Sequence, residues 1–192
     1  ISAVIENTGI QVSDIDVFAV TSGPGSFTGL RIGMSTIKGL ALPYNKPCVQ
    51  VSTLLAQAYE FKEFRGIICV CVDARQDEVY NAIFKCTELG LEQIVSDRAV
   101  LIKDLNKELC GYKDKIKLVG DKAELCYNML AECDSINNEL LSFERKSLKA
   151  STVGLIAKEF YEKNKTLSVA DIKPIYLKVS QAERMLGKIG GK

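Results

Sequence analysis

Residues 21–33 read TSGPGSFTGLRIG, and this stretch decides the fold. An apolar run at residues 15–20 precedes it and is typical of a β-strand, and an apolar-periodic run at residues 30–42 follows it and is typical of a helix. Between the two runs, three glycines and one proline supply the positive-φ positions and the fixed φ that a tight reversal needs. The sequence therefore predicts a strand, a glycine loop and a helix whose first N–H groups lie against that loop.

The glycine loop has the form of an anion-binding site, because a helix N-terminus carries about half a positive charge. Its candidate residues are Gly23, Gly25, Ser26, Thr28 and Gly29. Against this, the stretch lacks the lysine of a P-loop and does not have GxGxxG spacing. Phe27 suits a buried anchor as well as a ligand contact, and glycines also occur where a helix packs closely on a strand. Anion binding and a purely structural role both stay open.

The bulk composition excludes several classes of protein. The 192 residues are enough for one large domain or two small ones, and a net charge of +1 is too small to hold nucleic acid unaided. Histidine is absent, which excludes a Ser-His-Asp triad, a Cys-His dyad and any His-ligated metal within these residues.

Cysteine usage and the apolar runs indicate a cytoplasmic protein. The 7 cysteines include no CxxC pair, so neither a disulfide framework nor a zinc ribbon is indicated. Cys69, Cys71 and Cys86 fall in strand-like runs and are expected to be small buried hydrophobic residues. We expect no signal peptide and no membrane contact, because the longest apolar run, residues 67–72, is too short to cross a bilayer.

Strand and helix patterns alternate in the first third of the chain. A helix at residues 1–8 is expected to end at Gly9. The glycine loop and its flanking elements are followed by a strand at residues 47–51 and a helix at residues 52–61, with Ser52 as its N-cap. Such alternation predicts βαβ units and a parallel sheet.

Beyond residue 65 the pattern changes. Residues 67–73 and 78–86 are β-rich runs joined by a short polar link, which predicts an antiparallel hairpin. The remaining predicted elements are strands at 91–95 and 116–119, helices at 101–109, 123–131 and 151–161, an irregular stretch at 134–149 and a strand-like run at 174–177. We therefore expect an α/β subdomain at residues 1–65, a mixed α/β subdomain at 66–170 and a tail at 171–192.

The predicted sheet of the first subdomain is narrow. A single pair of adjacent parallel strands is a poor sheet, because parallel sheets are usually wider and covered on both faces. The chain also opens in mid-helix without a methionine. We expect that N-terminal strands are missing from this sequence.

Three motifs, spread over almost the whole chain, resemble the TsaB (YeaZ) family. The most specific is GPGSFTGLRIG at residues 23–33, with Lys38-Gly39-Leu40-Ala41 shortly after it. The others are Asp73-Ala74-Arg75 followed by Glu78-Val79-Tyr80, and Pro174-Ile175-Tyr176-Leu177. The resemblance implies an α/β, actin-like (RNase H-like) fold of two subdomains in a degenerate form.

The same resemblance implies a role in the threonylcarbamoyl modification of adenosine in tRNA (t6A). In that family the protein is a non-catalytic subunit, with no catalytic residues, metal or cofactor of its own. Its partners are the related catalytic subunit TsaD and the ATPase TsaE, and it contacts tRNA only indirectly. A homodimer is expected when the chain is alone.

The alternative is an actin-like ATPase or small-molecule kinase that binds nucleotide between the subdomains. Such an enzyme needs a glycine-containing phosphate hairpin after the strand at residues 67–73. Asp73 is present there, but the residues that follow, Ala74, Arg75, Gln76, Asp77 and Glu78, include no glycine and two further carboxylates. Carboxylates repel phosphate, which argues against nucleotide turnover. We interpret Asp73 as an Asx-type cap on the hairpin turn in preference to a metal ligand.

The helix after the glycine loop predicts an interface. Small residues recur at i, i+4 spacing in Gly29/Gly33 and Ser35/Gly39, and apolar residues lie nearly all the way round. A helix that is apolar on more than one face is buried on more than one side, and its own sheet covers only one. The other face is expected to pack on a second chain together with the helix at residues 1–8, unless N-terminal strands or the second subdomain cover it. The predicted interface residues are Leu30, Arg31, Met34, Ser35, Lys38, Gly39, Ile1 and Ile5.

Arg31 lies in the first turn of this helix, where a cation opposes the helix dipole at a cost of about 0.3–1 kcal/mol. A nearby anion would compensate. Two sources stay open: a salt bridge to Asp14 or Asp16, or a carboxylate on a partner protein.

Overall fold

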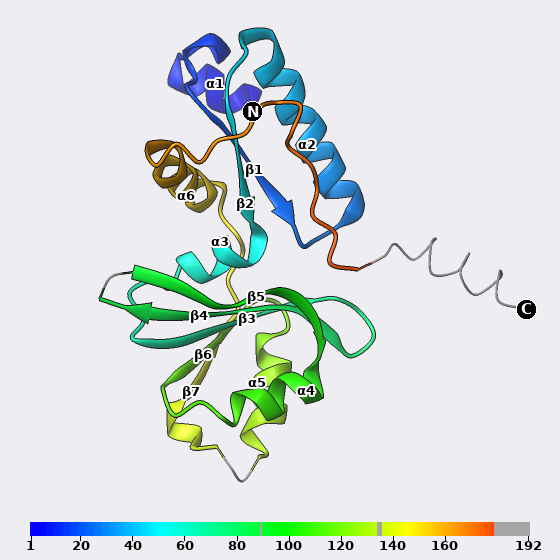
Figure 1. Ribbon diagram of the computed structural model, residues 1–192, viewed down its shortest axis with the longest axis vertical. Helices are drawn as coiled ribbons and strands as arrows, with labels where there is room; N and C mark the ends of the chain where they lie inside the picture. Colours follow the sequence, from blue (N-terminus) through cyan, green and yellow to red (C-terminus); the bar gives the residue numbers. More distant parts are fainter. Residues whose placement is uncertain (89, 134–135, 179–192) are drawn as a thin grey trace, which may run out of the picture. The chain divides into compact units, whose positions relative to one another are not determined.

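The computed structural model describes residues 1–88, 90–133 and 136–178 (Figure 1). The chain forms two compact units. Among the described residues, the first unit consists of Ile1–Ser52 and Ala150–Ile175, and the second consists of residues 53–88, 90–133, 136–149 and 176–178.

The first unit is built on a pair of parallel strands. Its elements are α1 (Ser2–Thr8), η1 (Val12–Asp14), β1 (Phe18–Gly23), α2 (Phe27–Ala41), η2 (Leu42–Tyr44), β2 (Cys48–Ser52) and α6 (Ala150–Glu162). Strands β1 and β2 pair in parallel and α2 connects them, so the predicted βαβ unit is confirmed. Helix α2 packs on β1, and α6 packs on both strands (Figure 1). The core between them contains Phe18, Val20, Met34, Ala41, Cys48 and Ile172.

The segment after α6 returns along β2. Leu167 exchanges both backbone hydrogen bonds with Cys48, and the side-chain amide of Gln50 bonds the backbone N–H and C=O of Lys173. Further on, the N–H of Ile175 donates to the carbonyl of Ser22 at 2.8 Å. This segment makes no ladder of its own, so the predicted strand at residues 174–177 is wrong. Pro174 has no N–H to contribute to such a ladder.

The second unit contains a mixed sheet of five strands in the order β5-β4-β3-β6-β7. Its elements are α3 (Thr53–Tyr59), β3 (Gly66–Asp73), β4 (Glu78–Thr87), β5 (Gly90–Leu101), α4 (Ile102–Leu109), β6 (Ile116–Val119), α5 (Ala123–Ala131), η3 (Asn138–Leu140) and β7 (Leu141–Glu144). Strands β3, β4 and β5 are antiparallel neighbours, which confirms the predicted hairpin, and β6 pairs in parallel with β3 and β7.

Helices cover both faces of this sheet. The side chains of β3 alternate between the two faces and so enter two separate cores. Ile67, Cys69 and Cys71 join a core with α4 and α5, while Ile68 and Val70 join a second core with α3. The three cysteines predicted to be buried, Cys69, Cys71 and Cys86, are at most 5% exposed, as expected.

Two strand predictions and the domain boundaries differ from the structure. Strand β5 extends to residue 101, beyond the predicted 91–95, and β7 lies in the stretch predicted to be irregular. Strand β7 has only four residues, of which Leu141 alone is buried, so it carries little apolar signal. Helix α6, expected in a subdomain ending at residue 170, belongs to the first unit because it packs on β1 and β2. The predicted tail from residue 179 onward lies outside the described residues.

Gly120 provides a test of this packing. It follows β6 with φ of +116°, and a Cβ there would lie 2.3 Å from the carbonyl oxygen of Cys71. Gly120→Ala is therefore expected to destabilise the protein by about 2–4 kcal/mol, as measured by urea unfolding. The matched control is Gly154→Ala in α6, where a Cβ meets nothing within 4 Å. Because alanine favours helix, this control should stabilise by about 0.5–1 kcal/mol. A neutral Gly120→Ala would contradict the close approach.

Candidate functional site

Helix α2 has apolar residues on two faces, of which one is buried and the other is exposed. Leu30, Met34 and Ala41 lie on one side and are buried against the first unit's own core. The opposite side carries Thr28, Ile32, Ser35 and Gly39, and Leu42, the C-cap of the helix, continues the same helical period; all five are exposed. We call these five residues the outer stripe. Ile32 is 63% exposed and Leu42 is 69% exposed, so apolar side chains lie near both ends of a stripe without charge.

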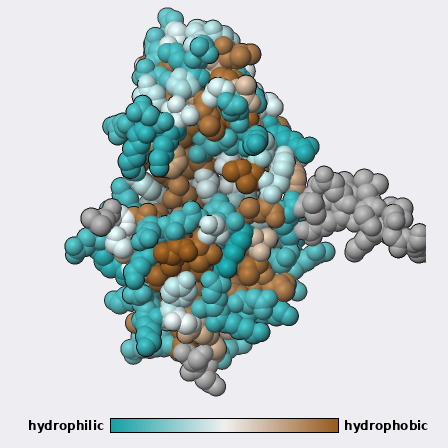
Figure 2. Space-filling model, in the orientation of Figure 1, coloured by the Kyte–Doolittle hydropathy of each residue, from teal (hydrophilic) through white to brown (hydrophobic). Residues whose placement is uncertain are grey.

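The outer stripe suits close approach by another helix. Ser35 and Gly39 are small, and a Cβ built at Gly39 meets nothing within 4 Å. The hydroxyl of Thr36, beside the stripe, donates to the carbonyl of Ile32 at 2.9 Å and so stays on its own helix. Figure 2 shows apolar, brown surface on the first unit.

The structure corrects part of the predicted interface. Leu30 and Met34 are only 8% and 3% exposed, so their predicted place on a partner surface is wrong: they turn toward β1 instead. Ser35, Gly39 and Arg31 are exposed. Ile32 and Leu42 were missed, because apolar periodicity alone does not say which of two apolar faces the sheet covers.

The remaining predicted interface residues flank the stripe or lie on α1. Lys38 is half-buried, and its ammonium donates to the carbonyl of Ala170 at 3.4 Å, within the first unit. Helix α1 has no buried residue, and Ile1 is 63% exposed while Ile5 is half-buried. Val4, also on α1, is 62% exposed. Whether Arg31 pairs within the chain or with a partner stays a prediction.

The glycine loop satisfies part of its own helix terminus. Ser26 is the N-cap of α2, and its hydroxyl accepts from the N–H of Gly29 at 3.3 Å. Gly23 has φ of +116°, and a Cβ there would lie 2.7 Å from the carbonyl oxygen of Ile175. This glycine is therefore required for close packing of two chain segments. Gly25 has open space around it, and Thr28 and Gly29 are exposed. These contacts favour the structural role of the loop, and anion binding stays a prediction.

The β3–β4 turn is closed by side chains and an unusual backbone. The Asp73 carboxylate accepts from the N–H of Arg75 at 3.1 Å, which confirms the predicted Asx-type cap. Arg75, Gln76 and Asp77 have φ values of +64°, +56° and +58°, three consecutive left-handed positions without a glycine.

Two carboxylates around this turn, those of Asp73 and Glu78, are paired with lysines. The ammonium of Lys122 lies 3.6 Å from the Asp73 carboxylate. The Lys178 ammonium contacts the Glu78 carboxylate and donates to the carbonyl of Ala74 at 2.8 Å. Within residues 1–88, 90–133 and 136–178, no three His, Cys, Asp or Glu side chains are arranged to hold a metal ion. Phosphate binding at this turn is disfavoured mainly because the turn's backbone and carboxylates are already bonded within the chain. Charge repulsion by the carboxylates, which the sequence suggested, is the smaller effect because lysines pair with two of them.

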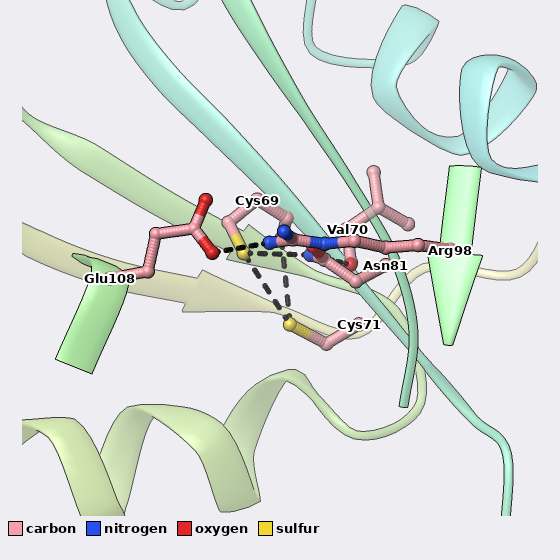
Figure 3. A network of polar contacts seen from close by, with 6 residues as sticks. All are labelled: Cys69, Val70, Cys71, Asn81, Arg98 and Glu108. Carbon is pink, nitrogen blue, oxygen red and sulfur yellow. Dashed lines mark hydrogen bonds and ion pairs between the residues drawn. The ribbon is translucent and has the colours of Figure 1, made fainter. Parts of the chain in front are cut away.

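A polar network within the second unit connects four elements, β3, β4, β5 and α4 (Figure 3). Asn81 of β4 is fully buried, and its amide donates to the carbonyl of Val70 at 2.9 Å. Arg98 of β5 donates to the amide oxygen of Asn81 at 3.1 Å and pairs with Glu108 of α4 at 2.6 Å. The network ties α4 to the sheet, and every member of it has a partner, which is what burial of polar groups requires. Sequence reasoning did not find it.

The buried thiol of Cys71, beside this network, has a raised pKa. Hydrogen bonds to Cys126 and Cys69, together with burial, raise the pKa of Cys71 well above its ordinary value. Burial likewise raises the pKa of Cys86. These cysteines therefore act as small apolar residues, in keeping with their positions in the core.

The chain is similar to proteins of threonylcarbamoyladenosine biosynthesis. Residues 1–184 match the family model described as "TsaD: tRNA N6-adenosine threonylcarbamoyltransferase". The protein named tRNA threonylcarbamoyladenosine biosynthesis protein TsaB from Bacillus subtilis is 27% identical over 184 residues, covering 95% of this chain and 78% of that protein. A tRNA N6-adenosine threonylcarbamoyltransferase from Kosmotoga olearia is 42% identical over 55 residues, covering 29% of this chain and 17% of that protein.

A solved structure shows the same fold. The crystal structure of an uncharacterized protein with similarity to peptidase YeaZ, from Pseudomonas aeruginosa, has a TM-score of 0.75 at 19% sequence identity. The alignment covers 92% of this chain and 80% of that one. The fold is thus that of the actin-like α/β proteins of TsaD type. The chain belongs to the TsaD family, and its resemblance to TsaB extends over nearly its whole length. No helix among the described residues is long and apolar enough to cross a membrane.

The left-handed run of the β3–β4 turn can be tested with Gln76→Gly. Glycine relieves a cost of about 1–2 kcal/mol at φ of +56° and adds backbone freedom to the unfolded chain, so a net stabilisation of about 0.5–1 kcal/mol is expected in urea unfolding. Glu92→Gly in the exposed part of β5 is the control and should destabilise by a similar amount. If Gln76→Gly also destabilises the protein, the left-handed conformation of residue 76 depends on contacts of the Gln76 side chain and not on the surrounding turn.

Proposed function

We propose that this protein is a non-catalytic, TsaB-type subunit of the cytoplasmic machinery that makes t6A in bacterial tRNA. It docks on a TsaD-type transferase through the outer stripe of α2. The observation that carries the proposal is the exposure of Ile32 and Leu42 on an uncharged face of a helix whose other face is already buried. An amphipathic surface helix normally presents charged residues to water on that side.

The dimensions of the stripe suit helix-on-helix docking. Small side chains at Ser35 and Gly39 allow another helix to approach closely, within the usual interaxial distance of about 8–10 Å. Ile32 and Leu42 then fill spaces between side chains of the partner. Full burial of either side chain contributes about 1.5–3 kcal/mol. Arg31 lies beside the stripe and is exposed, so its guanidinium favours a partner with a carboxylate at the edge of the contact.

Membership of the TsaD family supports the choice of partner. We expect a TsaD-type chain of the same family to present an equivalent helix, so that the two helices pair face to face around a local two-fold axis. A second copy of this chain can occupy the same face when the transferase is absent, which gives a homodimer. A TsaE-type ATPase is a further partner in this proposal. The net charge of the chain is only +1, which agrees with other subunits holding most of the tRNA.

The β3–β4 turn supports the absence of catalysis. A phosphate-binding hairpin needs backbone N–H groups that are open to the ligand. Here the N–H of Arg75 is bonded to Asp73, and that of Ala74 donates to the carbonyl of Glu78. Asp73 and Glu78 are themselves paired with Lys122 and Lys178.

The interface is tested by Ile32→Asp, which places a charge within the proposed contact. Its affinity for the TsaD-type protein of the same organism, measured by isothermal titration calorimetry, is expected to fall about 100-fold or more. Gly39→Leu is expected to act in the same direction through steric exclusion. The control is Leu155→Asp on α6, which is also in the first unit and 56% exposed, and which should bind normally. Unchanged binding by both α2 variants would overturn the proposed interface.

The absence of catalysis is tested separately by titrating the full-length chain with Mg-ATP. Neither binding at micromolar concentration nor turnover is expected without a partner. Micromolar binding with turnover would favour the alternative of an actin-like ATPase or small-molecule kinase.

A further inference from the structure

We propose that Cys110 and Cys133 form a reversible disulfide, a modification site that is independent of the proposed function. Their sulfur atoms lie 3.3 Å apart in the second unit, and both residues are half-buried. Neither residue belongs to the outer stripe or to the β3–β4 turn.

The two cysteines are held by the ends of two neighbouring helices. Cys110 directly follows α4, and its N–H donates to the carbonyl of Asn106 at 3.1 Å. Cys133 lies just beyond α5, and its N–H donates to the carbonyl of Leu130 at 3.0 Å. Since Leu109 and Leu130 are both fully buried in one core, the backbone on either side of the thiol pair is anchored. A disulfide has an S–S distance of about 2.05 Å, so the sulfurs need to move only about 1.3 Å closer.

The thiols of Cys69 and Cys71, another close pair, provide a contrast. The sulfurs of Cys69 and Cys71 are 3.7 Å apart, but both residues are fully buried. They also lie two residues apart on the same strand, where the backbone holds the Cα atoms near the upper limit for a disulfide. The pKa of Cys71 is raised, which further disfavours the reactive thiolate. Of these two pairs, only Cys110 and Cys133 combine proximity with access from solvent.

The oxidant is a low-molecular-weight disulfide such as oxidised glutathione. The thiolate of one cysteine attacks a glutathione sulfur and forms a mixed disulfide, and one glutathione leaves as a thiol. The second cysteine then attacks the protein sulfur of the mixed disulfide and releases the second glutathione. Two protein thiols are oxidised to one disulfide, and one glutathione disulfide is reduced to two thiols. An excess of reduced glutathione reverses both steps.

The bond closes a loop between residues 23 positions apart in the sequence. This loop contains β6 and α5, and α5 and α4 cover the same face of the sheet. Joining their C-terminal ends restricts separation of the two helices. Oxidation is therefore expected to make this layer of the second unit more resistant to opening.

The test is to equilibrate the full-length chain with oxidised glutathione at pH 8 and then to alkylate the remaining thiols in denaturant. The expected product carries five alkyl groups where the reduced protein carries one on each of its 7 cysteines. Proteolysis and mass spectrometry should recover one cross-linked pair of peptides, containing Cys110 and Cys133, and dithiothreitol should restore full alkylation. Cys86→Ala, the control, should form the same link. Cys110→Ser and Cys133→Ser should each stop at a glutathione adduct on the remaining cysteine.

Three results would overturn the proposal. These are seven alkylated cysteines after oxidation, a link that joins a different pair, and a link that joins two separate chains. A second measurement tests the effect on structure: amide hydrogen exchange in α5 should be several-fold slower in the oxidised protein than in the reduced protein. Equal exchange in the two forms would show that the bond does not restrain the helices.

Discussion

Burial of one side of α2 on β1 is the interaction on which the arrangement of the first unit depends. Met34 and Ala41 enter the core beside Phe18 and Val20, and Leu30 is buried on the same side of the helix, so the rotation of the helix about its axis is fixed. Once that rotation is fixed, the opposite side of the helix is fixed as well. Small and apolar residues on that side then point away from the core of the first unit.

The second unit depends on β3 in the same way. As the central strand of the sheet it contributes side chains to both cores, and its carboxyl end supplies Asp73 to the turn that follows. In nucleotide-binding proteins a turn at such a strand end leaves its backbone N–H groups available to phosphate. Here side-chain caps and lysine pairs occupy the turn. The backbone of this strand end is therefore held by contacts within the chain.

The sequence predicted the elements that carry a strong local pattern. The βαβ unit, the β3–β4 hairpin and the bounds of β6 and α5 follow from apolar periodicity and glycine placement. The Asx-type cap at Asp73 was predictable because it needs only the local chain. By contrast, β7 is too short and too exposed to give a pattern.

Other features depend on contacts that are distant in the sequence and leave no local signal. The inward rotation of Leu30 and Met34 depends on β1, and the exposure of Ile32 follows from it. The network of Asn81, Arg98 and Glu108 joins two strands and a helix, and the proximity of Cys110 to Cys133 depends on how α4 packs on α5.

The route of the chain after α6 also has a consequence for biosynthesis. Ile172 fills the core between β1 and α2, and Leu167 and Lys173 satisfy hydrogen-bonding groups of Cys48 and Gln50. A nascent chain on the ribosome has therefore made α1, β1, α2 and β2 long before the residues that complete them emerge. The intervening second unit, nearly continuous in the sequence, is free to fold first. Until residues 167–175 have been made, residues 1–52 are the ones that stay open to chaperones.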